Sequence, residues 1–190
     1  MKNILFTLIT IISINNVISQ NIMSFDEVID KGGFFKEGYY MKDTKNELDK
    51  YVGVWKGTFN QNTYEFRIEK HLKYNDGDFY LDKLFVRSLI KDINGIILLN
   101  TLTTPLEDLF FNGEVFTNKN YDTYQLMYIE DMKCNLQGDV YFTIFENNTK
   151  IKLNLYIPFN LVTKDECADI NKHSLLPESR INEYMILTKQ

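Results

Sequence analysis

A regular alternation of apolar and polar residues, interrupted by turn-forming residues, is the feature of this sequence that most constrains its fold. From residue 52 onward, segments rich in β-branched and aromatic side chains are separated by Asn- and Gly-containing turns about every ten residues. Nine strands are predicted in this region: 52–59, 63–74, 79–90, 96–103, 109–116, 121–130, 139–146, 149–158 and 184–188. Short strands with such regular turns predict an all-β protein, either a sandwich or an antiparallel barrel.

Two hairpins have the clearest pattern. Apolar and charged residues alternate over 64–69, and Asn75-Asp76-Gly77-Asp78 supplies the turn into the next strand. Residues 140–144 and 151–157 alternate in the same way on either side of the turn Asn147-Asn148. Because successive side chains of a strand point to opposite faces, each hairpin is expected to have one buried face and one solvated face.

The first nineteen residues have the pattern of a secretory signal peptide. Lys2 precedes an apolar run over 4–14, and small or aliphatic residues lie in Val17-Ile18-Ser19, before Gln20. The run is shorter than the ~20 apolar residues that a membrane-spanning helix needs. We therefore expect cleavage after Ser19, a secreted or periplasmic protein, and no stable membrane insertion afterwards. An uncleaved anchor and a buried N-terminal strand are the alternatives.

Residues 20–47 form an N-terminal extension of different character. Ser24 and Glu27 match a capping box and predict a short helix, which Gly32-Gly33 would end within two turns. Four aromatic residues are expected to dock the extension: Phe34, Phe35, Tyr39 and Tyr40. The predicted organisation is thus a signal peptide over 1–19, an extension over 20–47 and one β domain over 48–190.

Composition and charge restrict the possible partners. The chain has 190 residues, of which 44% are hydrophobic, which is enough for one globular domain with one core. Its 26 acidic and 21 basic residues give a net charge of −5, and the basic residues form no stripe. This distribution argues against binding of nucleic acids or of anionic membrane surfaces.

The sequence predicts no catalytic residue, metal site or cofactor. His71 and His173 lie far apart, and no phosphate-binding loop, dinucleotide fingerprint, nucleophile elbow or zinc-protease motif is present. An enzyme is therefore not expected. Cys134 and Cys167 can form a disulfide outside the reducing cytosol, and two buried free thiols are the alternative, because the sequence does not give their Cα separation.

The single tryptophan lies in the segment Val52-Gly53-Val54-Trp55-Lys56. Gly53 allows another segment to approach closely, and the large ring of Trp55 can close the narrow end of a small barrel. This placement resembles the G-x-W signature of the calycins, which comprise lipocalins and fatty-acid-binding proteins. The resemblance implies a lipocalin-like, up-and-down antiparallel barrel of about eight to nine strands that holds one small hydrophobic molecule.

Residues 40–190 also resemble a group of small secreted bacterial proteins classed only as a domain of unknown function. The segments that carry this likeness are Leu48–Lys56, Asn94-Gly95 with Asn100-Thr101-Leu102, Gly138-Asp139-Val140-Tyr141 and Met185-Ile186-Leu187-Thr188-Lys189. The resemblance implies a fold and no activity.

Two functional hypotheses follow from a closed barrel, whose interior is either filled or large enough for one small ligand. The first is a carrier that binds a small hydrophobic or amphipathic ligand in a cavity of a few hundred Å³. Six of its candidate contact residues face inward by alternation: Phe66, Ile68, Leu126, Tyr128, Leu153 and Leu155. The other two are Trp55, which can also serve only as a structural plug, and Arg87, which has the parity of Leu81 and Phe85. Ordinary core packing is the alternative for the apolar ones, and a surface salt bridge for Arg87.

The second hypothesis is a solid-core barrel that serves as a protein-interaction or inhibitor-type module. Its contact surface would be an apolar patch built from the aromatic residues of the extension, or the long connection over 161–182. The sequence does not identify the protein partner.

Overall fold

The computed structural model describes residues 21–33, 37–158, 167, 174–177 and 184–190. The described strands are β1 (Ile22–Ser24), β2 (Tyr40–Lys42), β3 (Gly53–Phe59), β4 (Asn62–Asn75), β5 (Tyr80–Lys91), β6 (Ile97–Asn100), β7 (Phe111–Phe116), β8 (Thr123–Asp131), β9 (Leu136–Phe145), β10 (Lys150–Tyr156) and β11 (Met185–Lys189). The described helices are α2 (Phe25–Asp30) and the short 3₁₀ helices η1 (Glu47–Lys50) and η2 (Leu106–Asp108).

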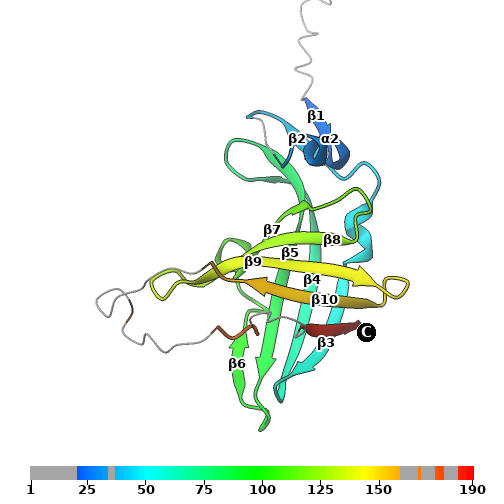
Figure 1. The fold of residues 1–190 in the computed structure, drawn as a ribbon. Coiled ribbons are helices and arrows are strands. Elements are labelled where there is room, and N and C mark those ends of the chain that lie inside the picture. Colours follow the sequence, from blue (N-terminus) through cyan, green and yellow to red (C-terminus); the bar gives the residue numbers. More distant parts are fainter. Residues whose placement is uncertain (1–20, 34–36, 159–166, 168–173, 178–183) are drawn as a thin grey trace, which may run out of the picture.

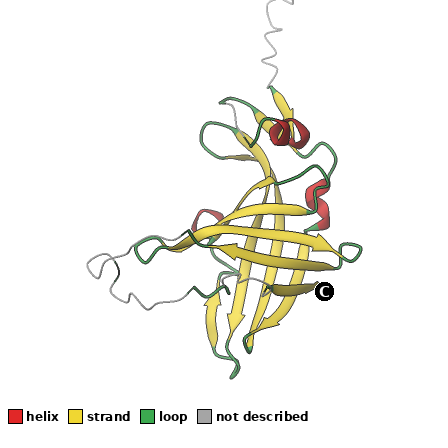
Figure 2. Cartoon of the chain, viewed as in Figure 1, coloured by secondary structure: helices red, strands yellow, loops and turns green. Residues whose placement is uncertain are grey.

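Eight of the strands form a closed antiparallel barrel (Figures 1 and 2). The strand order is β5-β4-β3-β11-β10-β9-β8-β7, and β7 pairs with β5 to close the ring through Asn112 opposite Phe85 and Phe111 opposite Val86. The predicted lipocalin-like barrel of about eight to nine strands is confirmed. Each of the nine predicted strands coincides with one of β3 to β11.

The fourth predicted strand, β6, lies outside the closed ring. It pairs with the end of β5, with Asn100 opposite Leu89 and Ile97 opposite Lys91. Together β5 and β6 form a hairpin that extends beyond the barrel at the bottom of Figure 1. The chain then returns through η2 to β7, so the up-and-down order of the barrel is preserved.

Inside the ring, alternate residues of each strand form the main hydrophobic core. On β4, Tyr64, Phe66 and Ile68 are buried, whereas Arg67 between them is exposed. The same alternation buries every second residue over 124–128 of β8, 140–144 of β9 and 151–155 of β10. The period-two pattern of the sequence therefore corresponds to an inner and an outer face of the barrel.

The N-terminal extension packs on the outside of the barrel near the start of β5. Strand β2 pairs in parallel with both β1 and β5. The predicted capping box is present, since the Ser24 hydroxyl accepts from the Glu27 amide and the Glu27 carboxylate accepts from the Ser24 amide. A second, small core holds the extension in place and consists of Met23, Val28, Met41 and Leu81.

Two buried carboxylates join the extension to the barrel. Asp82 of β5 accepts hydrogen bonds from the Tyr40 hydroxyl at 2.6 Å and from the amides of Asp43 and Lys73 at 2.9 and 2.8 Å. Asp43 accepts from the amides of the first two residues of η1 and from the Lys70 ammonium. Each buried charge is thus compensated by several donors, as buried carboxylates require.

Candidate functional site

Trp55 lies fully buried inside the ring of strands. It is near the start of β3, at the barrel end where the chain arrives from η1. Its indole N–H donates to the carbonyl of Tyr51 at 2.7 Å, and the Lys189 ammonium lies 5.1 Å from the ring centroid. That ammonium also donates to the Lys50 carbonyl at 3.0 Å. Gly53 has φ = 133°, and a Cβ there would lie 3.2 Å from Cε of Lys189. Gly53 and Trp55 therefore contact Lys189 and hold β11 against the start of β3.

The other inward-facing apolar candidates are buried in the barrel interior. The side chains of Phe66, Ile68, Leu126, Tyr128, Leu153 and Leu155 all belong to the main core. The Phe66 ring lies 5.6 Å from that of Phe111 and 6.2 Å from that of Phe142, measured between centroids, and Phe111 lies 5.0 Å from Tyr128. Two of the residues proposed to contact a ligand, Phe66 and Tyr128, therefore pack against other rings of the core.

Within the part of the chain that the structure describes, one buried side-chain oxygen inside the ring has no hydrogen-bond partner. Ser88 lies opposite Phe66 and is fully buried, and among the described residues its hydroxyl oxygen is the buried side-chain atom without a hydrogen bond.

The prediction that Arg87 points into the barrel is wrong. The inward residues of β5 are Leu84, Val86, Ser88 and Ile90, so the odd-numbered residues lie on the outer face. The Arg87 guanidinium donates to the Glu69 carboxylate at 2.9 Å and to the carbonyls of Thr101 and Thr104. Arg87 thus forms a surface salt bridge with Glu69. Its hydrogen bonds to the two carbonyls also hold the chain after β6.

A described piece of the long connection, residues 174–177, covers the barrel end at which Tyr64 and Tyr128 lie. The Tyr128 hydroxyl donates to Glu130 at 2.5 Å, and Glu130 also accepts from the Leu175 amide at 2.9 Å. The Tyr64 hydroxyl donates to the Leu175 carbonyl, and Leu176 is buried in the core. Burial, together with Glu130, raises the pKa of the Tyr128 hydroxyl, so it stays a neutral donor.

The turn of the β5–β6 hairpin has a fixed backbone. The Asp92 carboxylate accepts from the amides of Asn94 and Ile96 at 2.9 and 2.8 Å. Gly95 takes a left-handed conformation with φ = 80° and donates to the Asp92 carbonyl. These bonds hold the turn without help from the side chains of its apolar residues.

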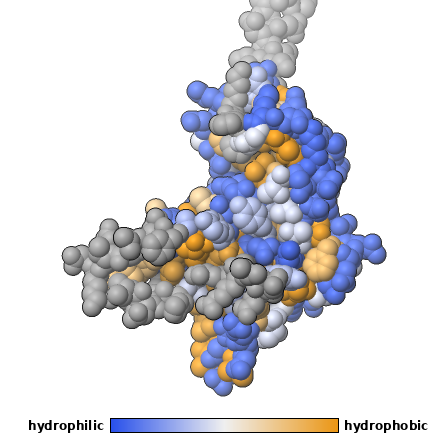
Figure 3. Space-filling model, in the orientation of Figure 1, coloured by the Kyte–Doolittle hydropathy of each residue, from blue (hydrophilic) through white to orange (hydrophobic). Residues whose placement is uncertain are grey.

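Those apolar residues are exposed. The exposed fractions are 66% for Ile93, 61% for Ile96, 55% for Ile97 and 41% for Leu98, and we call these four residues the aliphatic tip. Figure 3 shows hydrophobic surface at the lower end of the molecule, where the hairpin lies. A cluster of exposed aliphatic side chains is typical of an interaction site.

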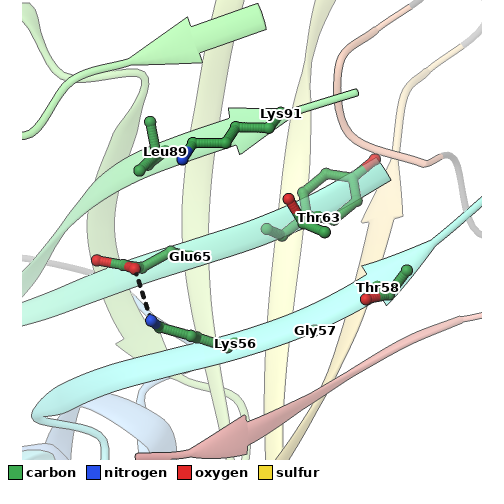
Figure 4. Close-up of a pocket in the computed structure, with 8 residues that line it drawn as sticks. Lys56, Gly57, Thr58, Thr63, Glu65, Leu89 and Lys91 are labelled. Carbon is green, nitrogen blue, oxygen red and sulfur yellow. Dashed lines mark ion pairs between the residues drawn. The ribbon is translucent and has the colours of Figure 1, made fainter. Parts of the chain in front are cut away.

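Two hollows on the described part of the surface both lie on the outer face of the barrel. The first has a volume of about 450 Å³ and spans β3, β4 and β5 (Figure 4). Lys56 and Glu65 form an ion pair of 3.0 Å across it, and Lys91 lies at its far side. The second, of about 430 Å³, includes Tyr184 with the Lys152 ammonium 4.9 Å from its ring centroid. Neither hollow contains a residue proposed to contact a ligand.

The whole chain, residues 1–190, matches the model of a family described as "Family of unknown function (DUF6705)". The chain belongs to this family. Membership in DUF6705 confirms the expected relation to a domain of unknown function. No curated protein and no solved structure matches the chain.

Two of the four aromatic residues that were expected to form an apolar patch on the extension are described by the structure. Tyr39 and Tyr40 are half-buried, Tyr39 packs against the small core, and Tyr40 is bonded to Asp82. Phe34 and Phe35 lie outside the described residues, as do His173 and most of the connection over 161–182.

The described helices include none long and apolar enough to cross a membrane. Within the described ranges, no cluster of three or more His, Cys, Asp or Glu residues could hold a metal ion.

Cys134 and Cys167 form a disulfide, with their Cα atoms 4.8 Å apart. The bond joins the turn between β8 and β9 to the connection that covers the barrel end. It closes a loop with a sequence separation of 33 residues. The free-thiol alternative does not apply to this DUF6705 member.

We expect the double variant Cys134→Ser/Cys167→Ser to lose about 3 kcal/mol of unfolding free energy, because the open loop regains entropy in the unfolded chain. Urea unfolding measures this loss, and reduced wild-type protein serves as the matched control. A loss below about 1 kcal/mol would contradict a stabilising role for the bond.

Two charged residues, Lys83 of β5 and Glu114 of β7, lie on the outer face of the barrel. Lys83 is buried and Glu114 is half-buried. Lys83 is fully buried, donates to Asp76 at 3.0 Å and lies 4.8 Å from the Tyr74 ring centroid. Burial lowers the pKa of Lys83, and Asp76 partly opposes this. Burial raises the pKa of Glu114, Asp139 adds to the rise, and Lys83 opposes it. Ionisation of Glu114 therefore costs folding free energy.

This cost gives a pH-dependent prediction. Because the pKa of Glu114 is higher in the folded state, its contribution to stability falls as the pH rises from the ordinary glutamate value of 4.5 through the folded-state value. We expect Glu114→Gln to raise the melting temperature at pH 7 and to have no effect below about pH 4. Glu107→Gln, at an exposed position, is the control and should have no effect at either pH. A lower melting temperature for Glu114→Gln at pH 7 would show that its charge stabilises the fold.

Proposed function

We propose that the protein acts through its outer surface as a protein-interaction module, with the aliphatic tip of the β5–β6 hairpin as its contact surface. The observation that carries this proposal is the exposure of four neighbouring aliphatic side chains on a hairpin that extends beyond the barrel. Residues 93–106 contain no charged side chain, although 25% of the chain is charged. A partner with an apolar, uncharged surface fits this segment.

The backbone of the turn supports a contact role. Asp92 and Gly95 hold the turn in one conformation before any partner binds. A contact surface that is already ordered loses less conformational entropy on association. The aliphatic tip is therefore prepared for binding rather than shaped by it.

The carrier hypothesis has less support, because the interior positions that a ligand needs are occupied by core side chains. Trp55, Phe66 and Tyr128 are fully buried among other core residues. A ligand of a few hundred Å³ would have to displace several of them, at a cost of several kcal/mol each.

We also propose that the protein works outside the reducing cytosol. The Cys134–Cys167 disulfide supports this location, because such bonds persist in oxidising compartments. Fractionation of cells that produce the protein tests it, and a purely cytosolic, reduced protein would contradict it.

Site-specific photo-crosslinking tests the interaction function. Benzoylphenylalanine is placed at Ile96 on the tip or, as control, at Leu72, whose exposed fraction is 67% but which lies on β4. In producing cells, we expect a discrete crosslinked product from position 96 and none from position 72. Excess wild-type protein should compete for the product, and an Ile97→Lys variant should not.

Two results would overturn the proposal. One is the absence of a competed product at position 96, or equal products at both positions. The other is a small molecule retained at one per chain in native mass spectrometry, which would favour the carrier hypothesis.

A further inference from the structure

We infer that the occupant of the aliphatic tip is a second copy of this chain, packed hairpin against hairpin about a two-fold axis. This inference rests on the proposed function and names its partner. A two-fold contact uses the same surface on both copies, so the surface must be complementary to itself. The tip meets this condition because its four residues are all aliphatic.

Charge favours self-contact at this segment over other parts of the surface. The chain carries a net charge of −5, so two copies repel each other wherever acidic residues face acidic residues. Residues 93–106 carry no charge. The charges next to the tip on the β5 side, Lys91 and Asp92, have opposite signs, and the Asp92 carboxylate is already bonded within the turn. Two tips can therefore meet without placing like charges opposite each other.

The strand arrangement agrees with this contact. Among the described residues, β6 pairs with β5 alone, so one edge of β6 is open to a further strand. The successive residues Ile97 and Leu98 are both exposed, which means that both faces of β6 are accessible. Antiparallel approach of two such edges would bring the aliphatic side chains of both copies together.

The size of the tip predicts a weak, reversible dimer. Stable interfaces bury about 1,200–2,000 Å², which is more than four partly exposed aliphatic side chains per copy supply. The four-residue length of β6 and the register shift between Ile90 and Lys91 limit any shared ladder. We therefore expect a dissociation constant in the micromolar to millimolar range. The tip lacks the aromatic and basic residues of membrane-surface segments, which argues against a lipid partner.

Sedimentation velocity of the purified wild-type chain over a range of concentrations tests the inference. We expect the average mass to rise toward twice the monomer mass, and Ile96→Lys to weaken the association at least tenfold. Leu72→Lys makes the same chemical change at a similarly exposed position and should behave as wild type. In a second measurement, Asn94→Cys should form an intermolecular disulfide under mild oxidation, whereas Leu72→Cys should not. Circular dichroism confirms that each variant is folded.

A wild-type chain that stays monomeric up to millimolar concentration would overturn the inference. So would a dimer that Ile96→Lys leaves intact, growth beyond a dimer, or binding to phosphatidylcholine vesicles that the Ile96→Lys variant loses. If self-association fails while the crosslink at position 96 persists with a different protein, the proposed function stands and only the second copy is rejected.

Discussion

Replacing Trp55 with alanine will lower the free energy of unfolding by about 4 kcal/mol, the usual range for removing a fully buried large aromatic side chain. The loss has two sources in this structure. The indole fills core volume with no exposed surface, and its N–H donates to the Tyr51 carbonyl. The Lys189 ammonium also loses its aromatic neighbour. Urea unfolding at 25 °C measures the effect. The slope of the unfolding free energy against urea concentration should be the same for the variant and the wild type.

Trp55→Phe is the matched variant, because it keeps an aromatic ring but removes the N–H donor and some volume. We expect it to cost about 1–2 kcal/mol. A cost below about 1 kcal/mol for Trp55→Ala would mean that the indole does not close a packed barrel, and the account of the core would fail.

Replacing Asp82 with alanine will cost about 3–4 kcal/mol, because three donors lose one shared acceptor in a buried position. The donors are the Tyr40 hydroxyl and the amides of Asp43 and Lys73. Both Tyr40 and Asp43 belong to the extension, so faster proteolysis of residues 37–45 should accompany the loss of stability.

The control for this prediction is Asp78→Ala, which removes an exposed carboxylate from the same hairpin. It should change stability by no more than about 0.5 kcal/mol. Equal effects of the two substitutions would show that Asp82 does not join the extension to the barrel.

For a strand with one solvent-exposed face, the sequence was sufficient to predict which residues are buried. On β4 and β10, polar residues alternate with apolar ones, and the structure buries the apolar ones. Strand β5 is different, because all six residues from Leu81 to Val86 are buried. The barrel core covers one face of β5, while the extension covers Leu81 and the side chain of Tyr74 covers Lys83 and Phe85. Because β5 has no solvent-exposed face over these residues, its pattern does not show which residues point into the barrel. Alternation therefore assigned Arg87 to the inner face, although it lies on the outer face.

Other features depend on contacts between distant parts of the chain and could not be predicted from local patterns. Strands β1 and β2 have three residues each, too few for a readable period. The stacking of Lys189 on Trp55 joins the end of the chain to its first barrel strand. The pairing of the two cysteines required the Cα separation that the structure supplies.

The aliphatic tip was the main omission from the candidate site, although the sequence contained a signal for it. Residues 96–103 were assigned to a barrel strand, and such an assignment accounts for aliphatic residues as core. The uncharged stretch over 93–106 is the signal that could have separated an exposed hairpin from a buried strand. The tip is exposed because β7, and not β6, closes the ring.

Xenon binding, measured by NMR, tests whether core side chains fill the barrel, as the interaction function requires. Xenon enters dry apolar cavities inside proteins. We predict no saturable interior binding for the wild-type protein and the appearance of such binding in Trp55→Ala, where the removed indole leaves a cavity. Saturable binding of xenon inside the wild-type barrel would show that the interior is not filled and would favour a carrier.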